Sequence, residues 1–510
     1  MKNDNVLRST ALLTLSGIGA KTIDFVFRAY YSRLLGNEGL GLFSLCFTLH
    51  SIMLNIATGG VGVAVSKIVS EKFVKQEYGE INATMHVALT SVFVLSTAVI
   101  GIACMFAKQI AEGFLNEPRC AVSIIYLSPS VLFMGLSYCI KGYFYASRRV
   151  LPPASSEFLE QAVKIVSITY LLGQKLPYGV EQGCEAVFMG ISLGEFSSCL
   201  YLSVFYAFDK RKRQCNAKSN NFRAAASVAK IAVPIMTTSI AASLIRSKEE
   251  VLIVDSLKKS GLSHTNALGI YGEIYGMVMP LVVFPLTLLS SCFTMLVPEI
   301  SRAYARKSSV RLKTLVSKIY RFCTFFGFLV ACVIVTYSAE LSDLVYNAPQ
   351  IAQHLRTVAL LCPLMFVDSV SCGMLNGMGK QNSLLAFNFA DAISRILLIF
   401  VLLPKFGTKA LIFVIFASNM LTPFLTMKKV LNETGIHFQW SEWCFKHLAC
   451  AGIAYFVSDS LMMGFCKTGM SEAVIAMVAT AILYFALGIV FSSTSRSDWR
   501  WLAERTFLNT

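Results

Sequence analysis

Residues 16–36, with the sequence SGIGAKTIDFVFRAYYSRLLG, decide the fold of this chain. The run is apolar over the length of a helix, yet it carries Lys21, Asp24 and Arg28. Their spacing of i, i+3 and i+7 places all three on one face of a helix. A charged side chain at the centre of a bilayer costs about 3 kcal/mol even on the lenient insertion scale, so this face cannot contact lipid. The stretch therefore predicts a transmembrane helix whose charged face lines a cavity or contacts another helix.

Composition places the chain among membrane proteins with many spans. It has 510 residues, of which 55% are hydrophobic and 15% are charged, and its mean hydropathy is +0.61. Its apolar runs repeatedly reach the roughly 20 residues that cross the hydrocarbon core of a bilayer. We predict an all-α integral membrane protein with about fourteen transmembrane helices. They are expected at residues 6–35, 40–66, 82–107, 121–146, 152–173, 184–208, 227–257, 267–297, 312–338, 354–378, 382–404, 408–430, 443–465 and 470–492.

The N-terminus and the cysteines exclude two other classes of protein. The first apolar run keeps ionisable groups and lacks a small-residue cleavage site, so we expect no cleaved signal peptide. The 15 cysteines are scattered, without a CxxC pair or a His/Cys cluster at metal spacing. We expect them to be small buried side chains, and we expect neither a disulfide framework nor a metal site.

The net charge of +16 is unevenly distributed along the chain. If the N-terminus is cytoplasmic, the cytoplasmic flanks are rich in Lys and Arg, as in residues 210–213 and 302–313. The opposite flanks hold fewer basic residues and include acids such as Glu112 and Asp343. This positive-inside pattern predicts a multi-pass protein of the cell membrane with both termini in the cytoplasm. The basic excess then reflects topology, and we expect no nucleic-acid partner.

A family resemblance appears at the end of the first predicted helix. Residues 28–41, RAYYSRLLGNEGLG, and the glycine-rich stretch that leads to the VSK of residues 65–67 resemble the opening hairpin of the stage V sporulation protein B group of polysaccharide-biosynthesis transporters. Residues 373–380, GMLNGMGK, resemble the exit of the tenth helix of that group, so the resemblance covers most of residues 6–430. The group belongs to the multidrug/oligosaccharidyl-lipid/polysaccharide exporter superfamily, which also contains lipid II flippases and drug antiporters.

The two halves of the chain share a sparse internal repeat. Gly41 and Gly272 are 231 residues apart, and Gly142, Glu160, Lys164 and Ile165 have counterparts at the same offset. Those counterparts are Gly373, Asp391, Arg395 and Ile396. An acid and a base thus recur one turn apart in both halves, which indicates an internal duplication of six helices.

The repeat predicts the domain organisation. Because six is an even number, both copies enter the membrane from the same side and form parallel repeats related by a pseudo-two-fold axis. We predict a six-helix bundle at 1–208, a basic cytoplasmic linker at 209–230, a second bundle at 231–430, and two additional helices with a cytoplasmic tail at 431–510. Such an added pair is what the resemblance implies, and we favour a stabilising role over a lipid-tail groove. A single chain with two halves needs no partner to form a cavity, so we expect a monomer.

Intramembrane charges supply the candidate substrate-binding residues. Arg28 and Arg246 lie in the first helices of the two halves, and arginine holds a phosphate with two parallel hydrogen bonds. If the two face each other across the pseudo-two-fold axis, they suit a diphosphate. The alternative is that nearby acids neutralise each cation and that the ion pairs hold neighbouring helices together. We favour a function for Arg28 and Arg246, and local pairing for Lys164 and Arg395. The full candidate set is Lys21, Asp24, Arg28, Arg246, Glu250 and Glu273.

Two functions remain open after enzymes are set aside. The chain has no GK[ST] phosphate loop, HExxH, GxSxG or DxD-type pair in a loop, and no soluble domain, so we expect no catalytic residues. The resemblance implies a flippase that moves a polyprenyl-diphosphate-linked saccharide, such as a cell-wall precursor or a polysaccharide repeat unit, by alternating access. The alternative is a cation-coupled multidrug antiporter of the same superfamily, and the mixed charges at membrane depth do not decide between them.

The energy source of transport is a separate question. Asn388 and Asp391, together with an acid of the seventh helix, offer the oxygen ligands that a sodium ion or a proton needs. We expect no cofactor beyond such a coupling Na⁺ or H⁺.

Overall fold

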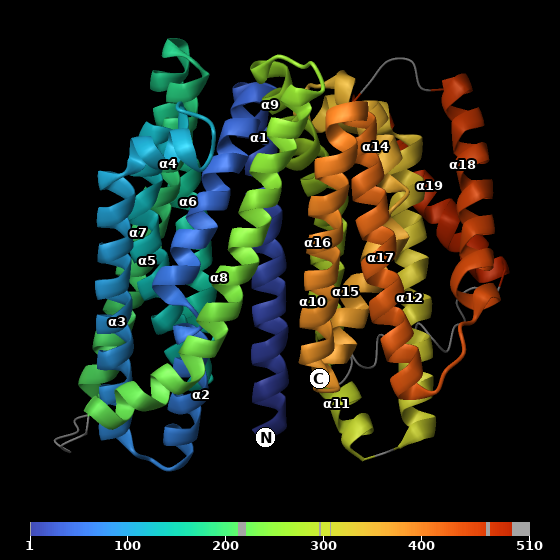
Figure 1. The fold of residues 1–510 in the computed structure, drawn as a ribbon. Helices are drawn as coiled ribbons and strands as arrows, with labels where there is room; N and C mark the ends of the chain where they lie inside the picture. The colour runs from blue at the N-terminus through green and yellow to red at the C-terminus, as the bar shows by residue number, and fades with distance from the viewer. Residues whose placement is uncertain (1, 213–220, 295–296, 307, 466–469, 492–510) are drawn as a thin grey trace. The chain divides into compact units, whose positions relative to one another are not determined.

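The computed structural model describes residues 2–212, 221–294, 297–306, 308–465 and 470–491. Every regular element assigned within these ranges is helical (Figure 1). The prediction of an all-helical fold is therefore confirmed.

The chain divides into two compact units. The first comprises Met1–Asp255 and His264–Gly272, and the second comprises Ser256–Ser263 and Glu273–Thr510. The boundary between the two units falls within α8, after Asp255. The domain boundaries predicted from the sequence, at residues 208, 230 and 430, stay a prediction. Each unit is described here by itself.

The first unit is a bundle of long helices joined by short connections. Its elements are α1 (Lys2–Thr58), α2 (Val61–Val74), α3 (Tyr78–Met105), α4 (Ala107–Gly113), α5 (Cys120–Ala146), α6 (Leu151–Lys175), a 3-10 turn (Leu176–Tyr178), α7 (Val180–Lys212), α8 (Asn221–Lys259), whose last turn belongs to the second unit, and α9 (His264–Tyr271). The core of this bundle lies where α2, α3 and α5 pack together, and it includes Val65, Met85 and Tyr143.

A break at Gly36 divides α1 into two helical segments. Gly36 has φ 65° and ψ −174°, a backbone conformation that residues with a Cβ atom rarely adopt. The break falls between the predicted spans 6–35 and 40–66, but no loop separates them, because the chain resumes a helical course at Asn37. A second interruption follows at Gly60, with φ 81°, where α2 begins.

Glycines permit a close approach between α1 and α9. A Cβ placed on Gly41 would lie 2.5 Å from the carbonyl oxygen of Leu268, and one placed on Gly272 would lie 2.0 Å from that of Asn37. Real Cβ atoms do not tolerate such distances. The backbones therefore touch at two glycines that the internal repeat relates to each other.

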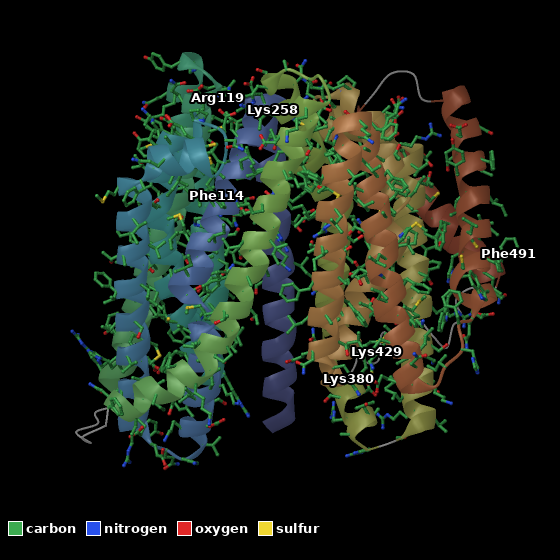
Figure 2. All side chains as sticks on the ribbon, in the orientation of Figure 1. Phe114, Arg119, Lys258, Lys380, Lys429 and Phe491 are labelled. Atoms are coloured by element: carbon green, nitrogen blue, oxygen red, sulfur yellow. The ribbon has the colours of Figure 1, made fainter. Side chains whose placement is uncertain are left out.

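A polar cluster at one end of the first unit also holds α9 in place. Arg119, labelled in Figure 2, lies 2.6 Å from Glu38 and 2.8 Å from Glu117. His264 Nε2 lies 3.1 Å from the other oxygen of Glu117, and Asn116 donates a hydrogen bond of 2.6 Å to Asp255. The cluster links the break in α1 to the loop before α5 and to the end of α8 and start of α9.

The second unit continues from α9 through a π-helical turn. Its elements are this turn (Gly272–Val278), α10 (Met279–Thr294), α11 (Val297–Ala305), α12 (Ser309–Thr336), α13 (Ser338–Tyr346), a 3-10 turn (Pro349–Ile351), α14 (Ala352–Ala359), α15 (Cys362–Gly377), α16 (Gln381–Phe406), α17 (Thr408–Thr434), a second π-helical turn (Ser441–Phe445), α18 (Lys446–Phe465) and α19 (Met470–Val490). A core formed by α11, α12, α15, α16, α17 and the second π-helical turn includes Tyr320, Phe366 and Trp443. The last two helices pack on α12 through Phe325, Cys450 and Tyr484.

The described residues contain many potential membrane crossings. Ten helices are long and apolar enough to cross a membrane, or eleven if the pair Pro349–Ala359 and Cys362–Gly377, bent by 55°, forms one span. One of the ten, Ser16–Val74, has 59 residues, about three times what one crossing needs, and it contains the break at Gly36. The chain is thus a multi-pass membrane protein, and the number fourteen stays a prediction.

Candidate functional site

A cavity of about 450 Å³ lies inside the first unit. Its lining comes from α1, α5, α6 and α7, and it includes the predicted residues Lys21, Asp24 and Arg28. Five further acidic or basic side chains of Asp, Glu, Lys or Arg type line the same space: Lys141, Glu157, Glu160, Lys164 and Glu195. The prediction that the charged face of the first helix lines a cavity is therefore confirmed.

Most of these charges are paired with one another. Lys164 lies 3.2 Å from Glu160 and 3.8 Å from Asp24, and Lys141 lies 3.3 Å from Glu157. This confirms that Lys164 is neutralised locally, as its position one turn after Glu160 predicted. Such pairing makes these charges tolerable at membrane depth because each has an opposite charge nearby.

Arg28 and Lys21 differ from this pattern. Among the described residues neither makes an ion pair, and the Nε atom of Arg28 is buried without a hydrogen-bond partner. The guanidinium carbon of Arg28 lies 5.9 Å from the ring centroid of Phe43, within the range of a cation–π contact. A buried donor without a partner is costly unless a ligand satisfies it. The two cations, two turns apart on α1, are therefore the part of the cavity best suited to an anion.

Aromatic side chains form the wall beside this cationic end. Phe27, Tyr31, Phe43 and Phe47 line the cavity, and the rings of Phe43 and Phe47 stack at 5.6 Å. Phe27, Tyr31 and Phe43 are buried, whereas Phe47 is 41% exposed. His50, which also lines the cavity, shares a hydrogen bond of 2.8 Å with Ser130. A cavity with aromatic walls and a few polar groups is typical of a small-molecule site.

The cavity combines two kinds of chemistry. It has four basic and four acidic side chains in its lining, so it is not the purely cationic cavity that a diphosphate alone would suggest. Carboxylates accept hydrogen bonds from hydroxyl groups, while Arg28 and Lys21 donate to an anion. The arrangement therefore suits a molecule that carries both hydroxyls and phosphate.

Sequence reasoning missed two members of this cluster. Lys141 lies in the predicted span 121–146 and Glu195 in the predicted span 184–208, and Glu195 is only 7% exposed. Both are ionisable residues inside an apolar run, so the rule that singled out Arg28 applies to them equally. Neither recurs at the repeat offset, which was the signal that drew attention to Lys164.

The other predicted substrate-binding residues do not line this cavity. Arg246 is exposed on α8. Glu250 accepts hydrogen bonds from Thr48 and, at 2.7 Å, from Tyr271, which join α8 to α1 and α9. Glu273 lies in the π-helical turn of the second unit, 3.6 Å from His354. The roles of Arg246, Glu250 and Glu273 in substrate binding stay predictions.

The predicted ion-coupling residues lie on α16 in the second unit. Asn388 is exposed, whereas Asp391 is 6% exposed and lies 3.4 Å from Arg395. The Oδ1 atom of Asp391 is buried without a hydrogen-bond partner among the described residues. No group of three or more His, Cys, Asp or Glu side chains suited to a metal ion occurs in the part of the chain that the structure describes. The role of Asn388 and Asp391 in ion coupling stays a prediction.

Comparison with known proteins identifies the family. The family described as "Polysaccharide biosynthesis protein" matches residues 6–304, more than half of the chain. The chain belongs to this family. The family described as MatE matches residues 251–401. This agrees with the resemblance that the sequence motifs indicated.

Curated relatives include sporulation proteins and a flippase. The chain is 24% identical over 509 residues to stage V sporulation protein B of Bacillus subtilis (strain 168), covering 98% of each chain. It is 26% identical over 221 residues to the lipid II flippase MurJ of the same organism, covering 41% of this chain and 40% of that protein. The family member thus resembles stage V sporulation protein B over nearly its whole length.

Solved structures show the same fold. An inward closed conformation of the lipid II flippase MurJ matches with a TM-score of 0.70 at 12% identity, covering 94% of this chain and 98% of that one. An inward-facing multidrug resistance transporter of the MATE family matches with a TM-score of 0.63 at 15% identity, covering 83% and 98%. The family member therefore shares the fold of these two proteins. The relatives whose printed names state an activity are a lipid II flippase and a multidrug transporter, not enzymes.

Proposed function

We propose that this family member is a flippase that moves a polyprenyl-diphosphate-linked saccharide across the cell membrane by alternating access. The substrate class is a peptidoglycan precursor or a polysaccharide repeat unit. Three observations support the proposal: membership of the polysaccharide biosynthesis protein family, similarity to a sporulation protein and to a lipid II flippase, and a cavity that offers both cations and hydroxyl-binding carboxylates.

The observation that carries the proposal is the state of Arg28. Its buried Nε has no partner among the described residues, and it opens on a cavity that also holds Lys21. A diphosphate would accept hydrogen bonds from both side chains. The saccharide would then lie against Phe43 and Phe47 and donate hydroxyl hydrogens to the carboxylates of α6 and α7.

The orientation, assembly state and energy source belong to the same proposal. The distribution of Lys and Arg supports cytoplasmic N- and C-termini, and we propose a monomer that binds its lipid-linked substrate from the bilayer. Asn388 and Asp391 would take up a Na⁺ ion or a proton, with the unpaired Oδ1 of Asp391 as one ligand. The test of coupling is that Asp391→Asn abolishes the cation dependence of transport.

The alternative function is that of a cation-coupled multidrug antiporter. It is supported by the MatE match at residues 251–401 and by the four carboxylates of the cavity, which would attract a cationic drug. Because most of these carboxylates are paired with lysines while Arg28 is not, we favour the anionic substrate.

The proposed function is tested by the lipids that co-purify with the protein. Mass spectrometry compares wild type, the double variant Lys21→Ala with Arg28→Ala, and the control Lys210→Ala with Arg211→Ala. The control removes one exposed lysine and one exposed arginine outside the cavity. We expect a polyprenyl-diphosphate saccharide in the wild type and the control but not in the double variant. Equal amounts in all three would contradict the proposal and direct attention to drug efflux.

A further inference from the structure

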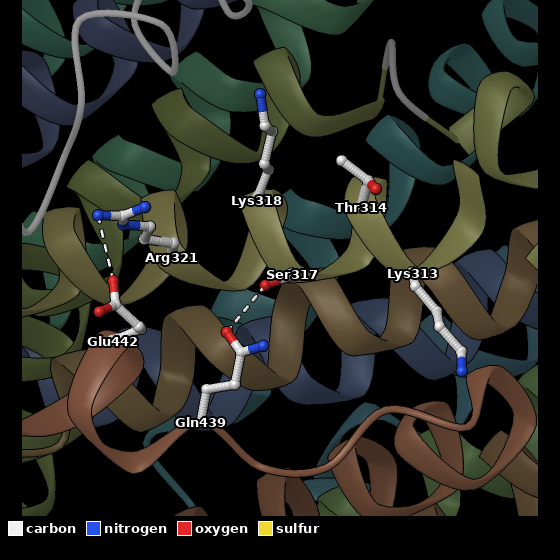
Figure 3. Close-up of a pocket in the computed structure, with 7 residues that line it drawn as sticks. All are labelled: Lys313, Thr314, Ser317, Lys318, Arg321, Gln439 and Glu442. Carbon is white, nitrogen blue, oxygen red and sulfur yellow. Dashed lines mark hydrogen bonds and ion pairs between the residues drawn. The ribbon is translucent and has the colours of Figure 1, made fainter. Parts of the chain in front are cut away.

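A second pocket lies in the second unit, far along the chain from the substrate cavity. It has a volume of about 460 Å³ and is formed by the first turns of α12 and the segment between α17 and α18 (Figure 3). Lys313, Lys318 and Arg321 of α12 line one wall, and Gln439 and Glu442 line the other. None of these residues belongs to the transport proposal.

The pocket carries an excess of positive charge. Its lining has three basic side chains and one carboxylate, that of Glu442. Glu442 is already shared, because it lies 3.1 Å from Arg321 and 2.5 Å from Lys446. Lys313 is exposed and makes no ion pair within the described part of the chain. The pocket therefore has room and charge for an anion beside the exposed ammonium group of Lys313.

Neutral donors add to the site. Ser317 donates a hydrogen bond of 3.0 Å to the side-chain oxygen of Gln439, which leaves the NH₂ group of Gln439 to donate elsewhere. Figure 3 shows Ser317 and Gln439 between Arg321 and Lys313, while Lys318 extends to the other side of α12 in this view. This arrangement of cations and neutral donors suits the oxygens of a phosphate.

Aromatic side chains place the pocket at the membrane surface. Trp440 and Phe445 are 62% and 59% exposed, and the ring of Trp440 lies 4.5 Å from that of Phe438. Trp443 is buried and anchors the segment through a ring contact of 5.1 Å with Tyr320. Exposed tryptophans of membrane proteins concentrate at the level of the lipid headgroups. The pocket also lies at the beginning of a candidate span, Val310–Thr336, where headgroups are expected.

We propose that this pocket binds the phosphate headgroup of an anionic phospholipid. Lys313 contacts the phosphate, Gln439 donates to it, and the acyl chains lie along the exposed aromatic rings of Trp440 and Phe445. Lys318 adds positive charge to the pocket without contacting the phosphate directly. The bound lipid fixes the segment 435–445 between α17 and α18 against α12. The occupant is a bilayer lipid because the segment that lines the pocket with Gln439 and Glu442 also carries the exposed rings of Trp440 and Phe445, which a soluble anion does not require.

Native mass spectrometry of the full chain tests the proposal. The protein in detergent is titrated with phosphatidylglycerol and, separately, with the zwitterionic phosphatidylcholine. The main variant is Lys313→Ala with Lys318→Ala; Lys313→Ala alone is a milder second variant because Lys313 is exposed. The matched control is Lys405→Ala with Lys409→Ala, which removes two exposed lysines of the same unit at the turn between α16 and α17.

The expected loss follows from the attraction of about 1 kcal/mol between each basic residue and an anionic membrane surface. We expect the double variant to bind phosphatidylglycerol roughly 30-fold more weakly and the single variant about fivefold more weakly. Binding of phosphatidylcholine is expected to stay the same, and the control to match the wild type. Equal loss in the variant and the control would overturn the proposal, since the effect would then follow net charge and not this pocket.

A competition experiment separates a lipid from a soluble anion. Inorganic phosphate and glycerol phosphate are added at millimolar concentration to the complex with phosphatidylglycerol. We expect the lipid to remain bound because its acyl chains contribute to the contact. Displacement by either soluble anion would assign the pocket to a soluble phosphate compound and overturn the lipid proposal. The outcome is independent of whether the protein flips a saccharide, because it is read without a transport assay.

Discussion

Arg28 shows how one residue links the sequence to the proposed chemistry. Its place in an apolar run predicted that it faces a cavity, and it does line one. Its neighbour Lys164 has two acidic partners, whereas Arg28 has none among the described residues. The difference between these two cations depends on tertiary packing. From the sequence alone, each cation could either bind a ligand or be neutralised by a nearby acid.

The first prediction concerns the guanidinium of Arg28. Hydrogen bonds to charged groups contribute about 1.5–3 kcal/mol, so Arg28→Ala should weaken binding of a polyprenyl diphosphate by roughly 10- to 100-fold. Arg28→Lys keeps the charge but loses the two parallel donors of the guanidinium, so its affinity should lie between those of the wild type and Arg28→Ala. Titration of the purified protein with the lipid measures both, with Arg211→Ala as the control. An unchanged affinity in Arg28→Ala would rule out a role in phosphate binding.

The second prediction concerns Glu117, outside the spans. Burial raises the pKa of its carboxyl group, but the hydrogen bonds and charge of Arg119, with His264, outweigh burial and hold the pKa below its usual range. A carboxylate with a lowered pKa stabilises the fold above its unfolded pKa of about 4.3, and this contribution is lost as the pH falls through the lower folded value. At pH values lower than about 4.3, we expect the thermal unfolding temperature of the wild type to decrease. The decrease should be smaller in Glu117→Gln. Identical pH profiles would contradict this.

At the scale of elements, sequence patterns predicted the start of the fold well. Gly36 ends the first helical segment as expected, because its positive φ suits only glycine. The glycine-rich stretch before residues 65–67 permits both an interruption and close packing: Gly60 has a positive φ, and a Cβ on Gly62 would lie 3.1 Å from the carbonyl oxygen of Tyr138. What the pattern could not reveal is that α9 and most of α8 belong to the first unit, because this depends on contacts between residues more than 150 positions apart.

The contact between α1 and α9 supports the third prediction. Gly272→Ala places a Cβ 2.0 Å from a backbone oxygen, so the helices must separate and the unfolding temperature should fall. Gly269→Ala, one turn earlier on α9, is the matched control because nothing lies within 4 Å of its Cβ. Replacing glycine by alanine inside a helix raises the free energy of unfolding by up to about 1 kcal/mol, so the control variant should be as stable as the wild type or slightly more stable. Equal stability of both variants would show that the two helices do not pack this closely.

At the scale of the whole molecule, the charge pattern predicts topology. Lys75, between α2 and α3, should be cytoplasmic, whereas Lys108, on α4, should face outward, and both are exposed. In a background with Cys104→Ser, which removes an exposed thiol, a membrane-impermeant maleimide should label Lys108→Cys but not Lys75→Cys in intact cells. Permeabilisation should allow both to react. The reverse labelling would contradict cytoplasmic termini.

The proposed function of the whole molecule requires that the cavity of the first unit binds the diphosphate that is flipped. The most direct measurement is translocation of a fluorescent polyprenyl-diphosphate saccharide between the leaflets of proteoliposomes. We predict that the wild type and the variant Lys210→Ala with Arg211→Ala speed translocation above protein-free vesicles, and that the variant Lys21→Ala with Arg28→Ala does not. Translocation by this last variant at the wild-type rate, or no translocation by the wild type, would contradict the account.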